Sequence, residues 1–160
     1  MISKPSIIVI GLGNKYRRDD GVGLYVAEQI RMLQLRGVHV VEGVSDGAAL
    51  IRIWSEADRV FVVDCAVSGQ VAGYIYRFDA IEEAIPEDVF YKFSTHAISV
   101  SEAVELAKTL GEIPKSLVVY GIEGKDFSSG EGFTPAVKSS ADSVAIQIVG
   151  EFNISNEKKR

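Results

Sequence analysis

Residues 7–23 read IIVIGLGNKYRRDDGVG, and this stretch is the strongest indication of the fold class. Four successive isoleucine and valine residues open it, which is typical of a strand buried on both faces, as in a parallel sheet. The two glycines that follow permit a sharp turn where a side chain would clash. A polar loop then ends in two adjacent carboxylates, Asp19 and Asp20, before a predicted helix. We therefore expect both carboxylates at the carboxyl edge of the sheet, where open α/β folds bind ligands.

This stretch permits two other interpretations. Aspartate is a favoured N-cap, so one of the pair could serve only to begin the helix. A dinucleotide-binding fingerprint would need glycine where the chain has Tyr16, and an acidic residue about 20 positions further on. Glu42, at the end of a later predicted strand, lies 29 residues after Gly13. The sequence also lacks the G-K-S/T of a P-loop, so its spacing excludes both nucleotide-binding motifs.

The bulk properties are those of one globular domain. The chain has 160 residues, of which 47% are apolar, and this is enough for a sizeable core. A net charge of −5 argues against a nucleic-acid partner, because such proteins concentrate Lys and Arg on one face. The single cysteine permits no internal disulfide, and no signal-peptide pattern or long apolar run is present, which predicts a cytoplasmic protein without a membrane partner. We expect one domain over residues 1–152 and a polar, disordered tail over residues 153–160.

The rest of the chain alternates predicted strands with predicted helices. Runs of β-branched residues predict buried strands, a more alternating run predicts an exposed edge strand, and helical periodicity marks the segments between them. The predicted strands after the first are residues 38–42, 60–63, 73–78 and 116–121. Because β-α-β connections favour parallel pairing, we expect an α/β fold. It is a three-layer α/β/α sandwich with a mostly parallel, twisted sheet of about five strands, one edge strand being antiparallel.

Three polar groups are expected at the carboxyl edge of this sheet. Asp64 ends the strand over residues 60–63, and His96 precedes a helix whose capping box begins at Ser99. With the Asp19/Asp20 loop they supply carboxylate and imidazole donors, which suit Zn, Ni, Fe or Mn. Three protein ligands leave positions open for water or substrate. A lone strand-end Asp or loop His is usually structural, so the predicted metal site depends on all three groups converging.

Cys65 offers an alternative, a nucleophile paired with His96. Because side chains alternate along a strand, Cys65 should face away from the site if Asp64 faces it. We therefore interpret Cys65 as a small buried hydrophobe. The Gly/Ser-rich segment 124–133 is long enough to be mobile or functional, but composition alone does not link it to a substrate.

Three motifs, in order, resemble those of the hydrogenase maturation peptidases, which remove a C-terminal extension from the large subunit of [NiFe] hydrogenases. GLGNKYRRDDGVG resembles the family's G-x-G-N-x4-D-D/E-x-x-G motif. VVDCAVSG resembles a second motif, a strand that ends in Asp, and STHAISVSEAVELA resembles a third, in which His precedes a helix. The resemblance covers residues 6–150, and three ordered motifs are far more specific than any one of them.

The resemblance implies that Asp20, Asp64 and His96 are the metal-binding and catalytic residues. Asp20 stands where other members carry Glu, an exchange that keeps the charge but shortens the reach. Asp19 would then be a helix cap or a neighbour that supports the site.

The turn after the second predicted strand departs from the family pattern. Many relatives carry Asp-Gly-Gly there, whereas this chain reads EGVSD over residues 42–46. Glu42 and Asp46 therefore remain second candidates for the catalytic site.

The activity that the resemblance implies is endopeptidase action on a nickel-loaded [NiFe] hydrogenase large-subunit precursor, with the nickel carried by the substrate. Zn or Cd would occupy the same residues in vitro, and a monomer is favoured. A carboxylate near the metal could accept a proton from a water molecule whose pKa the metal lowers. A non-catalytic nickel-binding accessory protein would use the same residues. The GLGN start also resembles peptidyl-tRNA hydrolases, but those continue with Pro-Gly and a catalytic His, which this loop lacks.

Overall fold

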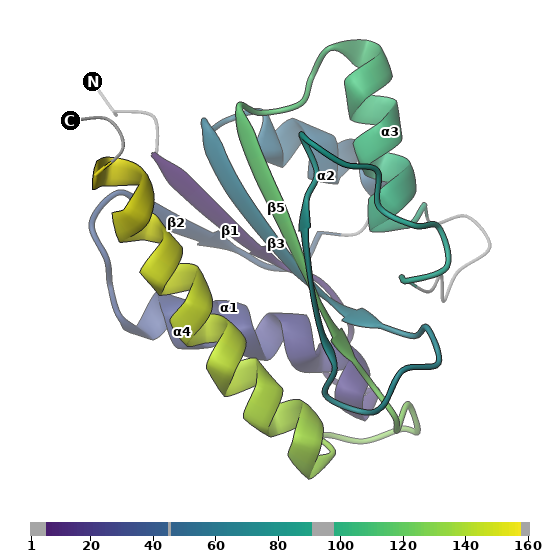
Figure 1. The fold of residues 1–160 in the computed structure, drawn as a ribbon. Helices are drawn as coiled ribbons and strands as arrows, with labels where there is room; N and C mark the ends of the chain where they lie inside the picture. Colours follow the sequence, from purple (N-terminus) through teal and green to yellow (C-terminus); the bar gives the residue numbers. More distant parts are fainter. Residues whose placement is uncertain (1–5, 45, 91–97, 158–160) are drawn as a thin grey trace.

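The computed structural model describes residues 6–44, 46–90 and 98–157. Strands and helices alternate along most of the chain, as the sequence pattern predicts (Figure 1). The strands are β1 (Ile7–Gly11), β2 (Val38–Val41), β3 (Arg59–Ala66), β4 (Ile75–Asp79) and β5 (Ser116–Glu123). The helices are the 3-10 helix η1 (Arg18–Gly21) and the α-helices α1 (Val22–Met32), α2 (Gly47–Trp54), α3 (Val100–Leu110) and α4 (Pro135–Glu157).

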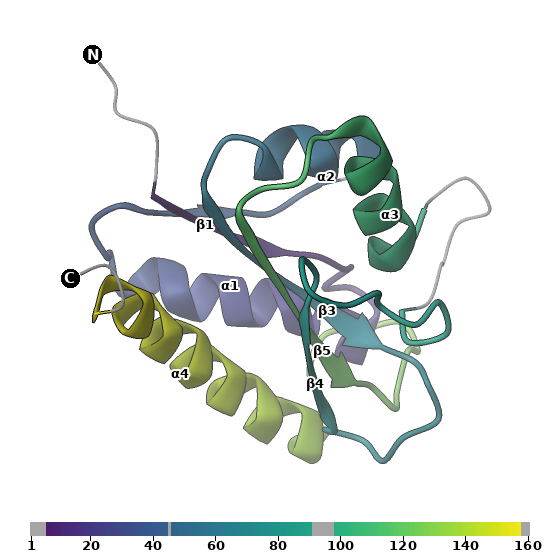
Figure 2. The same cartoon turned by 45° about the horizontal axis from the view of Figure 1, so that its top comes forward.

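The strands form one sheet in the order β2-β1-β3-β5-β4. The first four of these are parallel, and β4 pairs with β5 in the antiparallel direction at the edge. The helices α1 and α4 pack on one face of the sheet, and α2 and α3 pack on the other (Figure 1, Figure 2). The predicted three-layer α/β/α sandwich with one antiparallel edge strand is therefore confirmed.

Each face of the sheet has its own hydrophobic core, because side chains alternate along each strand. In β3, Val60 and Val62 pack toward α2 and α3, whereas Phe61 and Val63 pack toward α1 and α4. Both faces of this strand are thus occupied by apolar side chains until the polar Asp64, which comes near its carboxyl end.

Two glycines let the loop after β1 and the start of α1 lie close against β3. Gly23 packs so tightly that an added Cβ would lie 2.3 Å from the carbonyl oxygen of Val63. Gly13 has a φ of 122°, and an added Cβ there would lie 1.9 Å from the carbonyl oxygen of Asp20. A side chain at either position would push the loop away from the strand. This close packing brings η1, and Asp20 with it, to the carboxyl end of β3.

The C-terminal helix α4 is longer than the sequence pattern indicated. We expected residues 153–160 to be a disordered tail, but α4 continues to Glu157. Phe152 is buried against Phe61 with their ring centroids 5.4 Å apart, and the Arg59 guanidinium donates to two carbonyl oxygens of the same helical turn. These contacts fix the helix at Phe152, near the point where the tail was expected to begin. Neither α4 nor any other helix of the described residues is long and apolar enough to cross a membrane.

The stretch from the edge strand to α3 is where the sequence pattern was least informative. The strand β4 begins at Ile75, later than the predicted range 73–78, because Gly73 has a φ of 87° that does not fit an extended strand. The described residues after β4 form turns but still bury four apolar side chains in the core toward α2 and α3. These side chains are those of Ala80, Ile85, Val89 and Phe90.

Candidate active site

Asp64 and Asp20 reach the same part of the molecule from two different segments. Asp64 lies near the carboxyl end of β3, the central strand, where its register partner is Gly121 on β5. Asp20 lies on η1, which contacts β3 because α1 packs so closely against that strand. The structure therefore brings together two of the three residues that the sequence predicted for the site.

Both carboxylates accept few hydrogen bonds. Asp64 accepts one from the backbone N–H of Cys65 at 2.8 Å, and Asp20 accepts one from the backbone N–H of Asn14 at 2.9 Å. Within residues 6–44, 46–90 and 98–157, no other group donates to either of them. Each carboxylate therefore keeps acceptor capacity for a ligand.

The pKa values of both carboxylates are raised. Burial raises the pKa of Asp64 from 3.8 to about 7, and the negative charge of Asp20 adds to the rise, while the Cys65 N–H opposes it. Burial also raises the pKa of Asp20, against the effects of the Asn14 hydrogen bond and the charge of Arg17. Two like charges held in a poorly solvated place cost free energy, which a bound cation would offset. The pair is therefore suited to a metal cation.

Asp19, the neighbour of Asp20, has a different role. It is fully buried and accepts four hydrogen bonds of 2.7–2.9 Å, from the backbone N–H groups of Lys125, Asp126 and Thr134 and from the Thr134 hydroxyl. Burial raises the pKa of Asp19, but these hydrogen bonds, that from Asp126 foremost, outweigh it and bring the pKa below 3.8. Asp19 thus holds residues 124–134, which we call the clamped loop, against η1.

Neither Asp19 nor Asp20 caps α1. The N-cap residue of α1 is Gly21, and no side chain makes a capping hydrogen bond there. The predicted capping role is therefore wrong for both residues, because η1 precedes α1 and turns the two carboxylates toward Asn14 and toward the clamped loop. The alternative, that Asp19 supports the site from behind, agrees with these contacts.

Further hydrogen bonds tie the clamped loop to the residues before Asp19. The backbone N–H of Arg18 donates to the Gly130 carbonyl oxygen at 3.0 Å, and the Gly130 N–H donates to the Tyr16 carbonyl oxygen at 2.8 Å. The Arg18 guanidinium donates to the Glu131 carbonyl oxygen and to the Ser128 hydroxyl. The loop that the sequence left open is therefore an ordered neighbour of Asp20.

His96 lies outside the described residues, so the structure does not place it. The described residues on either side of it lie at the carboxyl edge of the sheet. The ring of Phe90 packs on Gly121, the register partner of Asp64, where an added Cβ would lie 3.0 Å from the ring. Ile98 packs against the first residue of α2. Within the part of the chain that the structure describes, no three His, Cys, Asp or Glu side chains form a group that could hold a metal ion.

The second candidates, Glu42 and Asp46, have other partners. Glu42 is exposed just past the end of β2, two strands from Asp64, and forms an ion pair with Arg31 at 3.3 Å. Asp46 is the N-cap of α2 and accepts a hydrogen bond from the Ala49 N–H at 2.7 Å. These contacts give both residues a structural role without involving Asp64.

Cys65 faces away from Asp64, as strand alternation predicts. Its side chain is buried in the core toward α1 and α4. Burial raises the pKa of the Cys65 thiol, and the negative charges of Asp64 and Asp20 raise it further. A thiol that stays protonated is a poor nucleophile. These observations argue against the alternative in which Cys65 attacks the substrate.

Glu123 is another buried carboxylate at this edge, and the sequence pattern did not indicate it. Its oxygens accept hydrogen bonds of 2.8–3.0 Å from the backbone N–H groups of Ser68 and Gly69 and from the Ser68 hydroxyl, which also contacts the Tyr76 hydroxyl. Glu123 thereby fixes the loop that follows Asp64. A single glutamate at the end of an otherwise apolar strand is the signal that could have indicated it.

Comparison with known proteins identifies the family. A family model described as hydrogenase maturation protease matches residues 24–151, which is most of the chain. The chain belongs to the hydrogenase maturation protease family. As a member of this family it is a hydrolase that cleaves a peptide bond in hydrogenase maturation, which supports the predicted enzyme over a non-catalytic accessory protein.

Relatives of this family resemble the chain over nearly its whole length. The hydrogenase expression/formation protein HupD of Thiocapsa roseopersicina is 26% identical over 161 residues, which cover 96% of this chain and 72% of the relative. The hydrogenase 2 maturation protease of Escherichia coli K12 is 24% identical, over 93% of this chain and 92% of the relative. The solved structure of the maturating endopeptidase HybD from Escherichia coli has a TM-score of 0.77 at 22% identity, over 93% of both chains. The maturation protease HycI from Thermococcus kodakarensis has a TM-score of 0.64 at 22% identity, over 90% of both chains. The structural matches establish the shared fold.

Proposed function

We propose that this protein is the endopeptidase that removes the C-terminal extension from a nickel-loaded [NiFe] hydrogenase large-subunit precursor. The family supports the reaction class, which is peptide-bond hydrolysis in hydrogenase maturation. In this proposal the precursor is the partner and brings the nickel with it. Asp20, Asp64 and His96 recognise that metal.

The incompletely bonded pair of Asp20 and Asp64 is the observation that carries the proposal. Each accepts one hydrogen bond from the described residues, and burial raises the pKa of both, so a cation suits the space between them. Carboxylate oxygens with one imidazole nitrogen form a donor set that nickel accepts. A third ligand from His96 is supported by Phe90 and Ile98, which lie at the same edge on either side of it in the sequence.

The small number of donors favours a metal that arrives with the substrate. Two carboxylates and one histidine leave coordination positions open and hold a metal less securely than a closed four-ligand site. Other divalent ions, such as Zn and Cd, would be able to occupy the same residues in vitro.

Each group of the chain has a distinct part in this proposal. Asp20, Asp64 and His96 hold the metal-bearing part of the precursor at the carboxyl edge, so that the scissile bond lies beside them. A bound divalent cation can polarise a carbonyl group and lower the pKa of a nearby water molecule. A carboxylate of the pair can accept the proton of the attacking water. Asp19 and Glu123 hold the two loops that surround the pair.

Mass spectrometry of a precursor incubated with the protein tests the proposal. The wild-type protein should shorten the nickel-loaded precursor by one discrete C-terminal segment, and Asp64→Asn and His96→Ala should leave it intact. Asp64→Asn is the sharper variant, because an amide oxygen can keep the hydrogen bond from the Cys65 N–H. A nickel-free precursor is the matched control and should stay uncut.

The possible outcomes separate the parts of the proposal. Equal cleavage of the nickel-free precursor would show that the protein does not recognise the metal, but it would still be a protease that acts on the precursor. Binding without cleavage by the wild-type protein would favour the accessory alternative. Full cleavage by His96→Ala would remove His96 from the site and leave the carboxylate pair to be tested by Asp64→Asn.

A further inference from the structure

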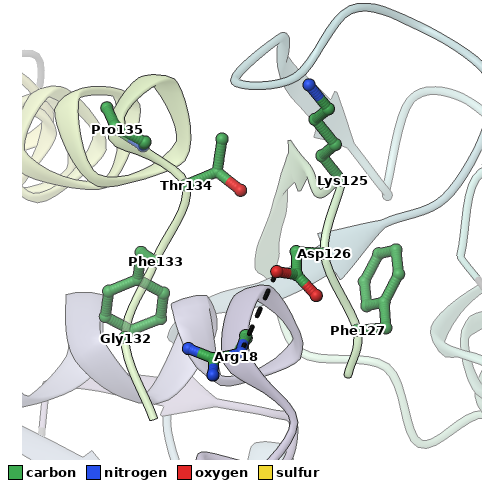
Figure 3. Close-up of a pocket in the computed structure, with 8 residues that line it drawn as sticks. All are labelled: Arg18, Lys125, Asp126, Phe127, Gly132, Phe133, Thr134 and Pro135. Carbon is green, nitrogen blue, oxygen red and sulfur yellow. Dashed lines mark ion pairs between the residues drawn. The ribbon is translucent and has the colours of Figure 1, made fainter. Parts of the chain in front are cut away.

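A pocket of about 570 Å³ lies between the clamped loop and η1 (Figure 3). Its lining comes from both ends of the clamped loop (residues 125–127 and 132–134), from Arg18 on η1 and from Pro135 at the start of α4. The site described above makes no use of this pocket, although Asp19 builds it by holding the loop in place. Phe133 lies beside Arg18 on one side of it, whereas the Phe127 ring lies on the other side of the loop backbone from Arg18 and packs toward the core (Figure 3).

The pocket has positively charged groups that are not fully paired by the described residues around them. Lys125 is exposed, and its ammonium group has no hydrogen bond or ion pair with any residue that the structure describes. Arg18 uses two guanidinium N–H groups within the loop, and Asp126 lies 3.9 Å from its Nε. The remaining guanidinium N–H groups have no partner among the described residues. The Asp126 carboxylate itself is bound to Ser128 by two hydrogen bonds, which hold it in the loop.

Arg18 is held in this position at a conformational cost. It has a φ of 47°, a left-handed conformation that a residue with a side chain adopts only where its surroundings impose it. Its backbone hydrogen bond to Gly130 and the contacts of its side chain with the loop supply that constraint. A cation fixed in this way is preorganised for an anion.

We propose that this pocket is a specificity subsite that binds an acidic side chain of the precursor, flanked by apolar neighbours, near the bond to be cut. The charge complementarity comes from Arg18 and Lys125, and the Phe133 ring beside Arg18 offers an apolar surface to a flanking residue. This inference rests on the proposed function, since it names the substrate segment that the peptidase would hold.

The position of the pocket suits such a subsite. Arg18 and Asp20 belong to the same 3-10 helix, and Asp19 between them binds the clamped loop. An extended peptide spans about 3.3 Å per residue, so a few residues of substrate could reach from the carboxylate pair to the pocket. The subsite would therefore bind the precursor without taking part in the reaction.

Peptide titration of the ¹⁵N-labelled protein tests the subsite directly. Acetyl-Leu-Glu-Leu-amide should shift the backbone amide resonances of residues 125–134 in a saturable way, and acetyl-Leu-Gln-Leu-amide should not. Lys125→Ala should weaken the binding about fivefold. Lys115→Ala is the matched control. It removes the same charge from an exposed lysine just before the amino end of β5, away from the pocket, and should bind like wild type.

Precursor cleavage gives a second, independent measure. Lys125→Ala should raise KM for the precursor about fivefold with little change in kcat, because the lysine binds substrate away from the reacting bond. Lys115→Ala should leave both constants unchanged.

Each outcome has a distinct meaning. Equal KM values for wild type and Lys125→Ala, together with no shifts from the glutamate peptide, would contradict the proposed subsite. The proposed peptidase function would not be affected by this result. Shifts only from acetyl-Leu-Gln-Leu with a free C-terminal carboxylate would overturn the side-chain assignment. Specific shifts from the glutamate peptide in a protein that cuts no precursor would support binding of an acidic side chain in the pocket and contradict the proposed function.

Discussion

Asp19 and Asp64 are carboxylates at the same edge of the sheet, yet their surroundings differ. Asp19 accepts four hydrogen bonds from the clamped loop, which together bring its pKa below 3.8 despite burial. From the residues that the structure describes, Asp64 accepts one hydrogen bond, and burial raises its pKa to about 7. A carboxylate whose acceptor sites are filled by backbone N–H groups stabilises the fold. A carboxylate left with open acceptor sites at a ligand-binding edge is available for chemistry.

The largest effect should come from Asp64→Asn. We expect it to lower kcat/KM for precursor cleavage by more than about 100-fold, because it removes one of the charges that would bind the metal. The free energy of unfolding should stay the same or rise, since a buried charge is replaced by a neutral group of equal size. Cleavage assays and urea unfolding measure the two effects. Near wild-type cleavage by this variant would show that Asp64 is as structural as Asp19.

Asp19→Asn should give the opposite result, a loss of stability. We expect the free energy of unfolding to fall by about 2–4 kcal/mol. Backbone N–H groups point at both oxygens of Asp19, so either orientation of an amide places its NH₂ group against a donor. Urea unfolding measures this loss. A change below about 1 kcal/mol would mean that the clamp contributes little to stability.

The two residues should also differ in the pH dependence of stability. Because the pKa of Asp64 rises from 3.8 to about 7 on folding, the folded state binds more protons, and this residue lowers stability progressively as the pH rises from 3.8 to about 7. The lowered pKa of Asp19 acts in the other direction, so its stabilising effect is complete above 3.8 and is lost as the pH falls below that value. Asp64→Asn should therefore gain stability over wild type by up to about 1.4 kcal/mol per pH unit between pH 3.8 and about 7, as measured by urea unfolding. A difference that does not vary with pH would contradict the raised pKa of Asp64.

Glu123→Gln should have a smaller effect than Asp19→Asn, although both residues are buried carboxylates that hold a loop. An amide oxygen can keep the two backbone hydrogen bonds from Ser68 and Gly69, and the Ser68 hydroxyl can rotate to accept from the new NH₂ group. We expect a loss of about 1 kcal/mol in the free energy of unfolding. A loss as large as that of Asp19→Asn would show that charge matters more than donor geometry in these loops.

Glu42→Gln should have the smallest effect and serves as the control for Asp64→Asn. Its exposed ion pair with Arg31 is worth no more than about 0.5 kcal/mol. We expect kcat/KM for the precursor to stay within about twofold of wild type, as is usual for exposed residues away from a site. A loss of activity comparable to that of Asp64→Asn would place Glu42 in the catalytic site after all.

Much of the fold could be predicted because the signals are local. Hydrophobic periodicity gave the order of strands and helices, and the alternating pattern of the edge strand agreed with its antiparallel pairing. The length of α4 could not be predicted, because its last turns are fixed by Phe152 on Phe61 and by the Arg59 guanidinium, which are contacts across the molecule. The role of Glu123 was missed for the same reason, since its partners lie in the loop after β3.

Local sequence patterns are enough to predict an α/β sandwich with carboxylates at the carboxyl edge of the sheet. Strand and helix patterns depend on neighbouring residues, and the position of Asp64 at a strand end follows from them. They do not predict which of Asp19 and Asp20 is a clamp and which is open to a ligand, because this depends on contacts in the folded chain. The two residues are adjacent and identical in type, and the hydrogen-bond donors that separate them lie 106 to 115 residues further along the chain. Such donors reach Asp19 only after the chain has folded.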